Sequence, residues 1–308
     1  GNLEDAIKAD NKEAARAGLV EVGRTVDLGD AQLWTRINSL DSPWVLDDLT
    51  TLVTEVGDDG ARRRPDELIV EEPMTIQLDG VTVATTMRTP GNDYELAVGF
   101  CHTEGLLAGA AVRGVRYCVS GAVDTGFNVV TVDTGGVAPE PTPRLGPTSS
   151  SCGWCGSEQL DDLCARLSPL PSTAPIPLDL MAAVPEQVRE HQDLFAATGA
   201  VHAAAAFTPE GEVVLVREDV GRHNAVDKVV GALLLEGSLP ATGTGLFVSG
   251  RASVEMVQKA WSAGFAALVA VSAPTALAVA TARRAGLLLA GFVRGDRLNV
   301  YAPERLPS

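Results

Sequence analysis

Apolar and polar positions follow three different patterns along this chain, and each pattern predicts a different kind of structure. In residues 1–58, the stretches Asp5–Leu19 and Leu33–Val56 are typical of helices, although Pro43 interrupts the second. No chemical motif stands out in this part of the chain. We therefore treat residues 1–58 as an N-terminal extension, a docking appendage or linker whose role the pattern leaves open.

An alternating pattern begins at Asp66 and predicts a β-rich domain over residues 59–178. Asp79-Gly80 stands between two alternating runs, and this dipeptide favours a β-hairpin because both turn positions must accept positive φ. Further expected elements are a helix over Tyr94–Leu107 capped by Asn92 or Asp93, and strands over Val112–Val119 and Phe127–Val132.

Strands and helices alternate in the last part of the chain, residues 179–308. The expected strands are Val213–Val216, Gly245–Val248, Ala267–Val271, Leu287–Phe292 and Leu298–Tyr301. The expected helices are Leu178–Ala197 with a new start at Pro185, His223–Leu235, Ala252–Ala263 and Thr275–Ala285. This alternation predicts an α/β fold with a layered sheet that contains parallel strands.

Charge and composition exclude several classes of protein. The 308 residues carry a net charge of −16, which argues against binding to nucleic acid because that draws on a basic surface. Ala260–Ala282 has no charge and is long enough to cross a bilayer, but its polar residues favour a helix end, a buried strand, a turn and a second helix. The first residues lack the pattern of a signal peptide, and five cysteines are too few for a disulfide framework. We therefore expect a protein of the reducing cytoplasm that does not enter the membrane.

Cys152 and Cys155 form the first candidate site. They follow a loop rich in Gly, Pro, Ser and Thr and precede an expected short helix, whose N-terminal amides favour a thiolate. Three functions fit such a pair: a dithiol redox couple, half of a zinc site, or a thiol that carries sulfur. Zinc is disfavoured because the chain has no second pair of this spacing, although Cys164 or a His could complete such a site. We assign no residue to a metal.

The second candidate is a set of three junctions between a strand and a helix. They are Arg217–Asn224, Ser249–Ser253 and Ser272–Thr275. In an open α/β sheet such junctions line the crevice where ligands bind, and their amides and arginines suit a pyrophosphate or another anion. The alternative is that the glycines only form turns and the arginines pair with nearby acids.

Two further motifs remain ambiguous. His202 precedes a run of small residues, but position 204 is Ala where a zinc deaminase needs Glu, so deaminase chemistry is excluded. A buried, hydrogen-bonded His is the default, and a role in positioning a ligand is the alternative. Gly291–Arg297 predicts a tight turn between the last two strands, which is either a plain hairpin or a grip for the end of a nucleotide.

Six segments together resemble the FdhD family of formate dehydrogenase accessory sulfurtransferases. They are Arg88–Phe100, Ser151–Gly156, Thr198–Ala203, Glu218–Lys228, Ser249–Ala260, and Ser272–Thr275 taken with Gly291–Tyr301. Their order and spacing resemble the family from about Ala61 to the C-terminus, so residues 1–58 fall outside the resemblance. The family's C-terminal domain is similar in fold to the cytidine deaminases, and the resemblance implies the same fold here.

The resemblance implies that the protein is a sulfurtransferase. It would accept sulfur from a cysteine desulfurase as a persulfide on Cys152, with Cys155 as the second thiol. It would then deliver that sulfur to the molybdenum (or tungsten) bis(molybdopterin guanine dinucleotide) cofactor of the formate dehydrogenase catalytic subunit.

The family's cofactor-binding turn corresponds to Phe292, Val293, Arg294, Gly295, Asp296 and Arg297. From their place at the junctions we add Arg222, His223, Ser249, Gly250, Arg251 and Thr275 as residues that hold the guanine nucleotide end of the cofactor. The resemblance is compatible with a homodimer. The alternative function is a chaperone that binds the cofactor and its dehydrogenase without sulfur chemistry.

Overall fold

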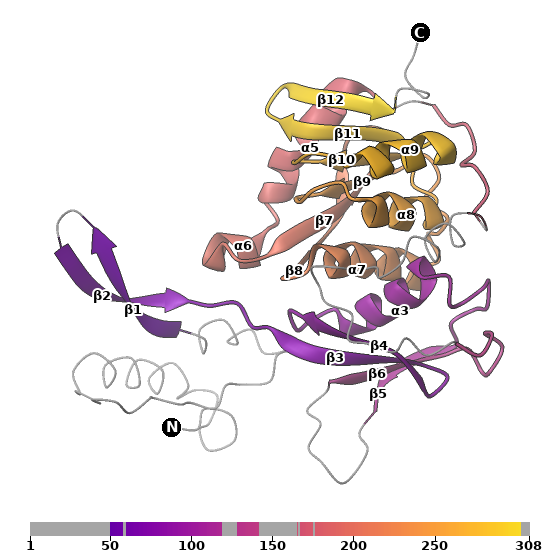
Figure 1. Ribbon diagram of the computed structural model, residues 1–308, viewed down its shortest axis with the longest axis horizontal. Helices are drawn as coiled ribbons and strands as arrows, with labels where there is room; N and C mark the ends of the chain where they lie inside the picture. Colours follow the sequence, from indigo (N-terminus) through magenta and orange to yellow (C-terminus); the bar gives the residue numbers. More distant parts are fainter. Residues whose placement is uncertain are drawn as a thin grey trace. The chain divides into compact units, whose positions relative to one another are not determined.

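The computed structural model describes residues 50–57, 60–118, 128–141, 165, 167–174 and 176–302 (Figure 1). These residues divide into two compact units. The first holds the described residues up to Val70 together with Ala196–Ala200, and the second holds the rest. The domain boundary predicted after residue 178 falls inside the second unit, which contains two separate sheets.

The first unit contains an antiparallel hairpin of β1 (Thr50–Gly57) and β2 (Gly60–Glu67). The helical pattern expected to continue to Val56 is therefore wrong from Thr50 onward. The β1 segment is rich in Thr and Val, whose branched side chains favour extended backbone over helix. The helices expected before Thr50 lie outside the described residues.

A four-stranded sheet opens the second unit. Its strands are β3 (Glu72–Leu78), β4 (Val81–Arg88), β5 (Gly114–Tyr117) and β6 (Val129–Asp133), in the order β4-β3-β6-β5. The predicted hairpin at Asp79-Gly80 is confirmed, because both residues have positive φ, 49° and 87°, between antiparallel strands. The Asp79 carboxylate also accepts a hydrogen bond of 2.7 Å from the Thr134 amide, which ties this turn to the end of β6.

A six-stranded sheet fills the later part of the chain. Its strands are β7 (His202–Phe207), β8 (Val213–Asp219), β9 (Gly245–Val248), β10 (Ala267–Ala270), β11 (Leu288–Arg294) and β12 (Arg297–Ala302). Their order is β12-β11-β10-β9-β7-β8. The expected parallel strands are confirmed for β9, β10 and β11, whereas β12 and β7 are antiparallel to their neighbours. Because β8 is antiparallel to β7, it runs in the direction of β9.

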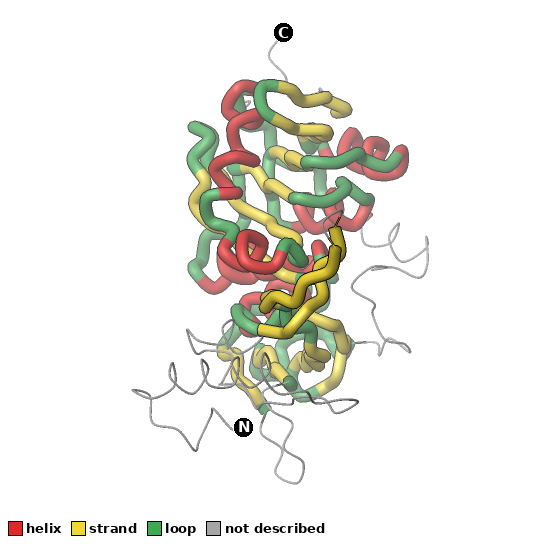
Figure 2. The backbone as a smooth tube through the Cα atoms, turned by 90° about the vertical axis from the view of Figure 1, so that its left-hand side faces the viewer, coloured by secondary structure: helices red, strands yellow, loops and turns green. Residues whose placement is uncertain are grey.

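Helices cover both faces of this sheet (Figure 2). One face packs against α5 (Leu178–Arg189), and the other packs against α7 (Arg222–Leu235), α8 (Val254–Ser262) and α9 (Ala276–Ala285). The short helix α6 (Asp193–Thr198) follows α5, and α3 (Asp93–Thr103) follows β4. Alternate strand residues point to opposite faces, so Ala204 and Leu246 pack with α7 and α8, whereas Ala205 and Phe247 pack with α5. The predicted α/β class is therefore confirmed.

Several predicted boundaries differ from the structure. Strand β7 was not expected, because its run of four alanines lacks the branched and aromatic residues that favour strands. Pro185 lies inside α5 and does not start a new helix. Helix α3 ends at Thr103, and Asn92 takes the cap position with a left-handed backbone and no side-chain hydrogen bond.

The uncharged stretch Ala260–Ala282 folds as expected into a helix end, the buried strand β10, a turn and the start of α9. Within the described part of the chain, no helix is both long enough and apolar enough to cross a membrane.

Two glycines allow α3 and α7 to approach each other closely. A Cβ atom at Gly99 would lie 1.8 Å from the carbonyl oxygen of Asp227, and a Cβ at Gly231 would lie 1.8 Å from that of Glu95. Neither position has room for a methyl group while the helices keep this distance. Since α3 also packs on the four-stranded sheet and α7 on the six-stranded sheet, this contact joins the two sheets.

We predict that Gly99→Ala and Gly231→Ala each lower the free energy of unfolding by about 1–3 kcal/mol, because the helices must move apart. Gly114→Ala is the control, since its new methyl group meets nothing within 4 Å. Urea unfolding followed by circular dichroism measures all three variants. The same loss in Gly114→Ala as in the helix variants would contradict the packing argument.

Candidate functional site

The carboxyl ends of β8, β9, β10 and β11 meet at one edge of the six-stranded sheet, because these strands run in the same direction. The three predicted junctions follow the first three of these strands. The junctions after β9 and β10 are neighbours, since the Thr275 amide donates to the carbonyl of Ala252 at 3.1 Å. The Phe292 amide likewise donates to the carbonyl of Ser272 at 3.2 Å. We call this part of the sheet the ligand edge. It consists of the three junctions and the C-terminal part of β11 at Phe292.

His202 lies at the ligand edge, at the start of β7. Its Nδ1 is 3.3 Å from the Ser249 hydroxyl, which also accepts a hydrogen bond of 2.9 Å from the Ala203 amide. A Cβ on Gly250 would lie 3.4 Å from the Arg222 side chain and 3.5 Å from the His202 ring. The structure therefore brings together residues from the starts of β7 and α7 and the end of β9.

Burial lowers the pKa of His202, and the positive charge of Arg222 lowers it further against the opposing field of Asp219. The ring is therefore neutral at pH 7. We expected a buried His202 from the sequence, but in the structure it is half-buried. A neutral imidazole beside a hydroxyl group can both donate and accept hydrogen bonds.

Arg222 and His223 form the first turn of α7, and they face the start of α8. Burial raises the pKa of Glu255, but the nearby Ser253 side chain, the Glu255 backbone amide and the positive fields of His223 and Arg222 outweigh burial and lower it overall. An acid therefore lies close to these two residues, as the alternative to anion binding requires.

The other junction residues have different surroundings. Arg251 is exposed at the ligand edge, one residue after Gly250. The Thr275 hydroxyl accepts a hydrogen bond of 3.2 Å from the Ala278 amide and caps α9, so the structure gives this side chain a local role. Helices α8 and α9 both begin at the ligand edge, so their first backbone amides lie there.

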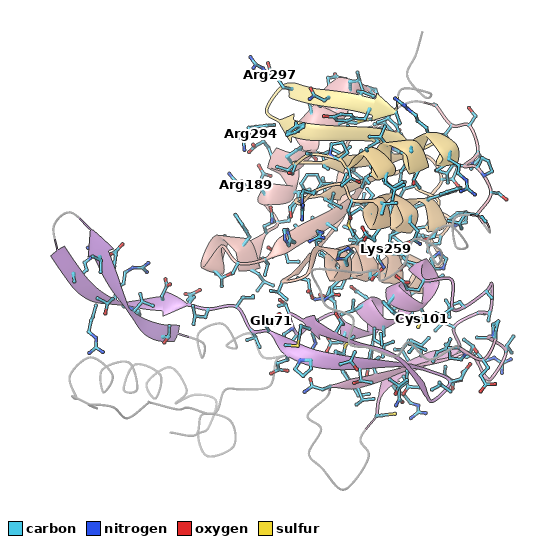
Figure 3. All side chains as sticks on the ribbon, in the orientation of Figure 1. Glu71, Cys101, Arg189, Lys259, Arg294 and Arg297 are labelled. Carbon is cyan, nitrogen blue, oxygen red and sulfur yellow. The ribbon has the colours of Figure 1, made fainter. Side chains whose placement is uncertain are left out.

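The turn predicted at Gly291–Arg297 is shorter in the structure, because β11 continues to Arg294, which pairs with Arg297 of β12. Only Gly295 and Asp296 form the turn of this hairpin. Phe292 is 50% exposed and has a φ of 54°, while Val293 is buried in the core. A bulky residue with positive φ is strained, and such strain is typical of ligand sites. Arg294 and Arg297 project from the end of the hairpin (Figure 3).

Cys152, Cys155 and Cys164 lie outside the described residues, so their surroundings stay a prediction. Cys101 is buried in α3 as expected, and burial raises the pKa of its thiol well above the ordinary value. Cys118 is half-buried rather than a core residue, with its sulfur 3.0 Å from the Thr131 hydroxyl. Among the described residues, no cluster of three or more His, Cys, Asp or Glu could hold a metal ion.

No role was assigned from the sequence to Thr89, Asp219 or Lys228, although all three lie in segments that resemble the family. They meet where β8 ends and α7 begins. Lys228 and Asp219 are both about 1% exposed or less and form an ion pair of 2.8 Å. Thr89 comes from the loop after β4 and bonds to both of them. Local sequence patterns give no signal of this contact, because Thr89 is 130 residues from Asp219.

These features define an α/β protein whose loops at the carboxyl ends of its strands form an edge suited to a ligand. The profile of the FdhD/NarQ family matches residues 69–307, and the chain belongs to this family. The resemblance found in the sequence is therefore confirmed.

Relatives over most of the chain agree with this assignment. The protein named "Sulfur carrier protein FdhD" in Streptomyces avermitilis is 49% identical over 262 residues, which cover 82% of this chain and 93% of the relative. The protein of the same name in Streptomyces coelicolor is 47% identical over 259 residues, covering 81% and 92%. A crystal structure from Desulfotalea psychrophila, assigned to a formate dehydrogenase accessory protein, shares the fold with a TM-score of 0.67 at 24% identity, covering 84% of this chain and 98% of that one.

We predict that Phe292→Gly is more stable than Phe292→Ala by about 1 kcal/mol, because only glycine adopts this φ without strain. Both variants lack the ring, so the comparison isolates the backbone. Thermal unfolding measures the difference. A Phe292→Ala variant as stable as Phe292→Gly would show that the backbone at Phe292 is not strained.

Proposed function

We propose that this protein is a sulfur carrier for the maturation of formate dehydrogenase. The observation that carries the proposal is that Cys152 and Cys155 lie inside the part of the chain that matches the family. Relatives at 49% and 47% identity are named sulfur carrier proteins. The solved structure with the same fold was assigned to a formate dehydrogenase accessory protein.

In the proposed reaction, the Cys152 thiolate attacks the outer sulfur of a persulfide on a cysteine desulfurase. A new sulfur–sulfur bond forms on Cys152 as the donor's bond breaks, and the donor leaves as a thiolate, so no net oxidation occurs. Attack of Cys155 on the Cys152 sulfur then releases the outer sulfur as sulfide while the two cysteines become a disulfide. This step balances because sulfur gains the two electrons that the thiols lose. A reductant such as a cellular thiol then restores the pair, which suits the reducing cytoplasm.

The acceptor in this proposal is the molybdenum bis(molybdopterin guanine dinucleotide) cofactor, bound as cargo. We propose that its guanine nucleotide end binds at the ligand edge, between the turn Phe292–Arg297 and the junctions with Arg222, Ser249 and Arg251. Helix N-terminal amides and arginines both favour phosphate oxygens, which supports this choice of ligand. The exposed Phe292 ring offers a flat apolar surface for a base.

We also propose that the part with the six-stranded sheet is similar in fold to the cytidine deaminases. The mixed sheet with helices on both faces supports this likeness. Deaminase chemistry is not part of the proposal, because Ala204 stands where such an enzyme has its catalytic Glu.

We predict that the protein gains one sulfur atom on the peptide containing Cys152 and Cys155 when incubated with a cysteine desulfurase and free cysteine. Mass spectrometry of the digested protein detects the added sulfur, and a reductant removes it because the persulfide bond is reducible. Cys152→Ala abolishes the gain, whereas Cys118→Ala, which changes a half-buried thiol directly after β5, leaves it unchanged.

An unmodified peptide in the presence of an active desulfurase would contradict sulfur transfer. The alternative is a cofactor chaperone without sulfur chemistry, and it requires that Cys152→Ala still matures formate dehydrogenase. Activity of the dehydrogenase in cells that carry this variant separates the two functions.

We predict that Arg251→Ala and Arg294→Ala each weaken the binding of guanosine diphosphate by about tenfold, because each removes a charged hydrogen bond to the diphosphate. Isothermal titration calorimetry measures the affinity. Arg113→Ala is the matched control, since Arg113 is an exposed arginine beside the four-stranded sheet. Full affinity in Arg251→Ala and Arg294→Ala would contradict the proposed place of the nucleotide.

A further inference from the structure

Thr89 uses all three of its polar groups to bind the junction between β8 and α7, although it is 130 residues away in the sequence. Its amide donates to the Asp219 carboxylate at 3.1 Å, and its hydroxyl accepts from the Val220 amide at 3.0 Å. Its carbonyl accepts from the Lys228 ammonium at 2.9 Å. Thr89 itself is 4% exposed, so water does not compete for these hydrogen bonds.

Asp219 holds the same turn from its other side. Its carboxylate accepts hydrogen bonds from the Gly221 amide at 2.8 Å and from the Asn224 side chain at 2.9 Å, in addition to Thr89. Lys228 balances its charge at 2.8 Å. The amides of Val220 and Gly221 precede the first turn of α7, so no helical carbonyl is available to them. Thr89 and Asp219 therefore fix the backbone immediately before Arg222.

The loop that carries Thr89 is itself held rigidly. Arg88 is 1% exposed and forms a paired contact with Asp93, at 3.1 Å and 2.9 Å. Its Nη1 donates to the Glu72 carboxylate at 3.1 Å, and its Nη2 also donates to the Asn128 side-chain oxygen at 3.2 Å. These contacts anchor the loop to β3 and α3, so the four-stranded sheet supplies a fixed support for a turn of the other sheet.

We propose that Thr89 is a positioning residue for ligand binding at the ligand edge. Its hydroxyl holds the Val220 amide, which sets the path of the backbone into Arg222. It thereby sets the place of the Arg222 side chain, whose Cδ lies next to Gly250, as does the His202 ring. This inference rests on the proposed binding of a guanine nucleotide at that edge. It adds a residue outside both the Phe292–Arg297 segment and the junctions. Through this residue, the four-stranded sheet supports the binding site.

The test compares Thr89→Val with Thr89→Ser by titration calorimetry with guanosine diphosphate. Valine has nearly the same shape but no hydroxyl, so we expect binding about tenfold weaker, whereas serine keeps the hydroxyl and the wild-type affinity. Thr85→Val is the matched control, because the Thr85 hydroxyl bonds to Thr75 inside the four-stranded sheet. Circular dichroism checks that each variant is folded, and Thr89→Ala replaces Thr89→Val if the latter does not fold.

A double-mutant cycle distinguishes positioning from a general structural effect. If Thr89 acts through Arg222, then Thr89→Val weakens binding less than twofold further in an Arg222→Ala background. A full tenfold further loss would overturn the inference, as would wild-type affinity in Thr89→Val. Either result would leave the proposed function intact, provided that the wild-type protein binds guanosine diphosphate and Arg222→Ala does not. No binding to the wild-type protein would overturn the proposed nucleotide site and this inference together.

Discussion

The contact between α3 and α7 is the constraint on which the rest of the second unit depends. Gly99 and Gly231 let each helix touch the backbone of the other, and the residues touched are Asp227 and Glu95. The side-chain carboxylates of these two residues form ion pairs, Asp227 with Lys259 at 2.8 Å and Glu95 with Arg217 at 2.5 Å. The Asp227–Lys259 pair is buried and the Glu95–Arg217 pair is half-buried, and each includes a residue that the partner helix touches.

Buried charges make this contact specific at some cost in stability. Burial lowers the pKa of Lys259, but the charges of Asp227 and Glu104 outweigh burial and raise it overall, so this lysine stays protonated. A well-packed apolar cluster of the same volume is often as stable as such pairs. An apolar cluster, however, has no directional bonds that could hold one loop against one turn. The Asp219–Lys228 pair has them, and it ties the loop after β4 to the start of α7.

The candidate site combines a ligand edge that the structure describes with two cysteines that are assigned from the sequence. The ligand edge is built on strands and helices whose geometry is fixed by packing, and it includes a strained Phe292. The proposed sulfur-carrying cysteines come from sequence and from family membership, and they lie outside the described residues.

By itself, the sequence determined the elements whose signals are local. The Asp79-Gly80 hairpin, the strands β9 and β10 and the helices α7, α8 and α9 follow from turn chemistry and from the spacing of apolar residues. Only the tertiary structure revealed β7, because buried alanines have no strand preference of their own, and only it brought Thr89 to Asp219 across 130 residues. Contacts between distant residues depend on how closely two helices pack, and no local pattern in one sequence records that distance.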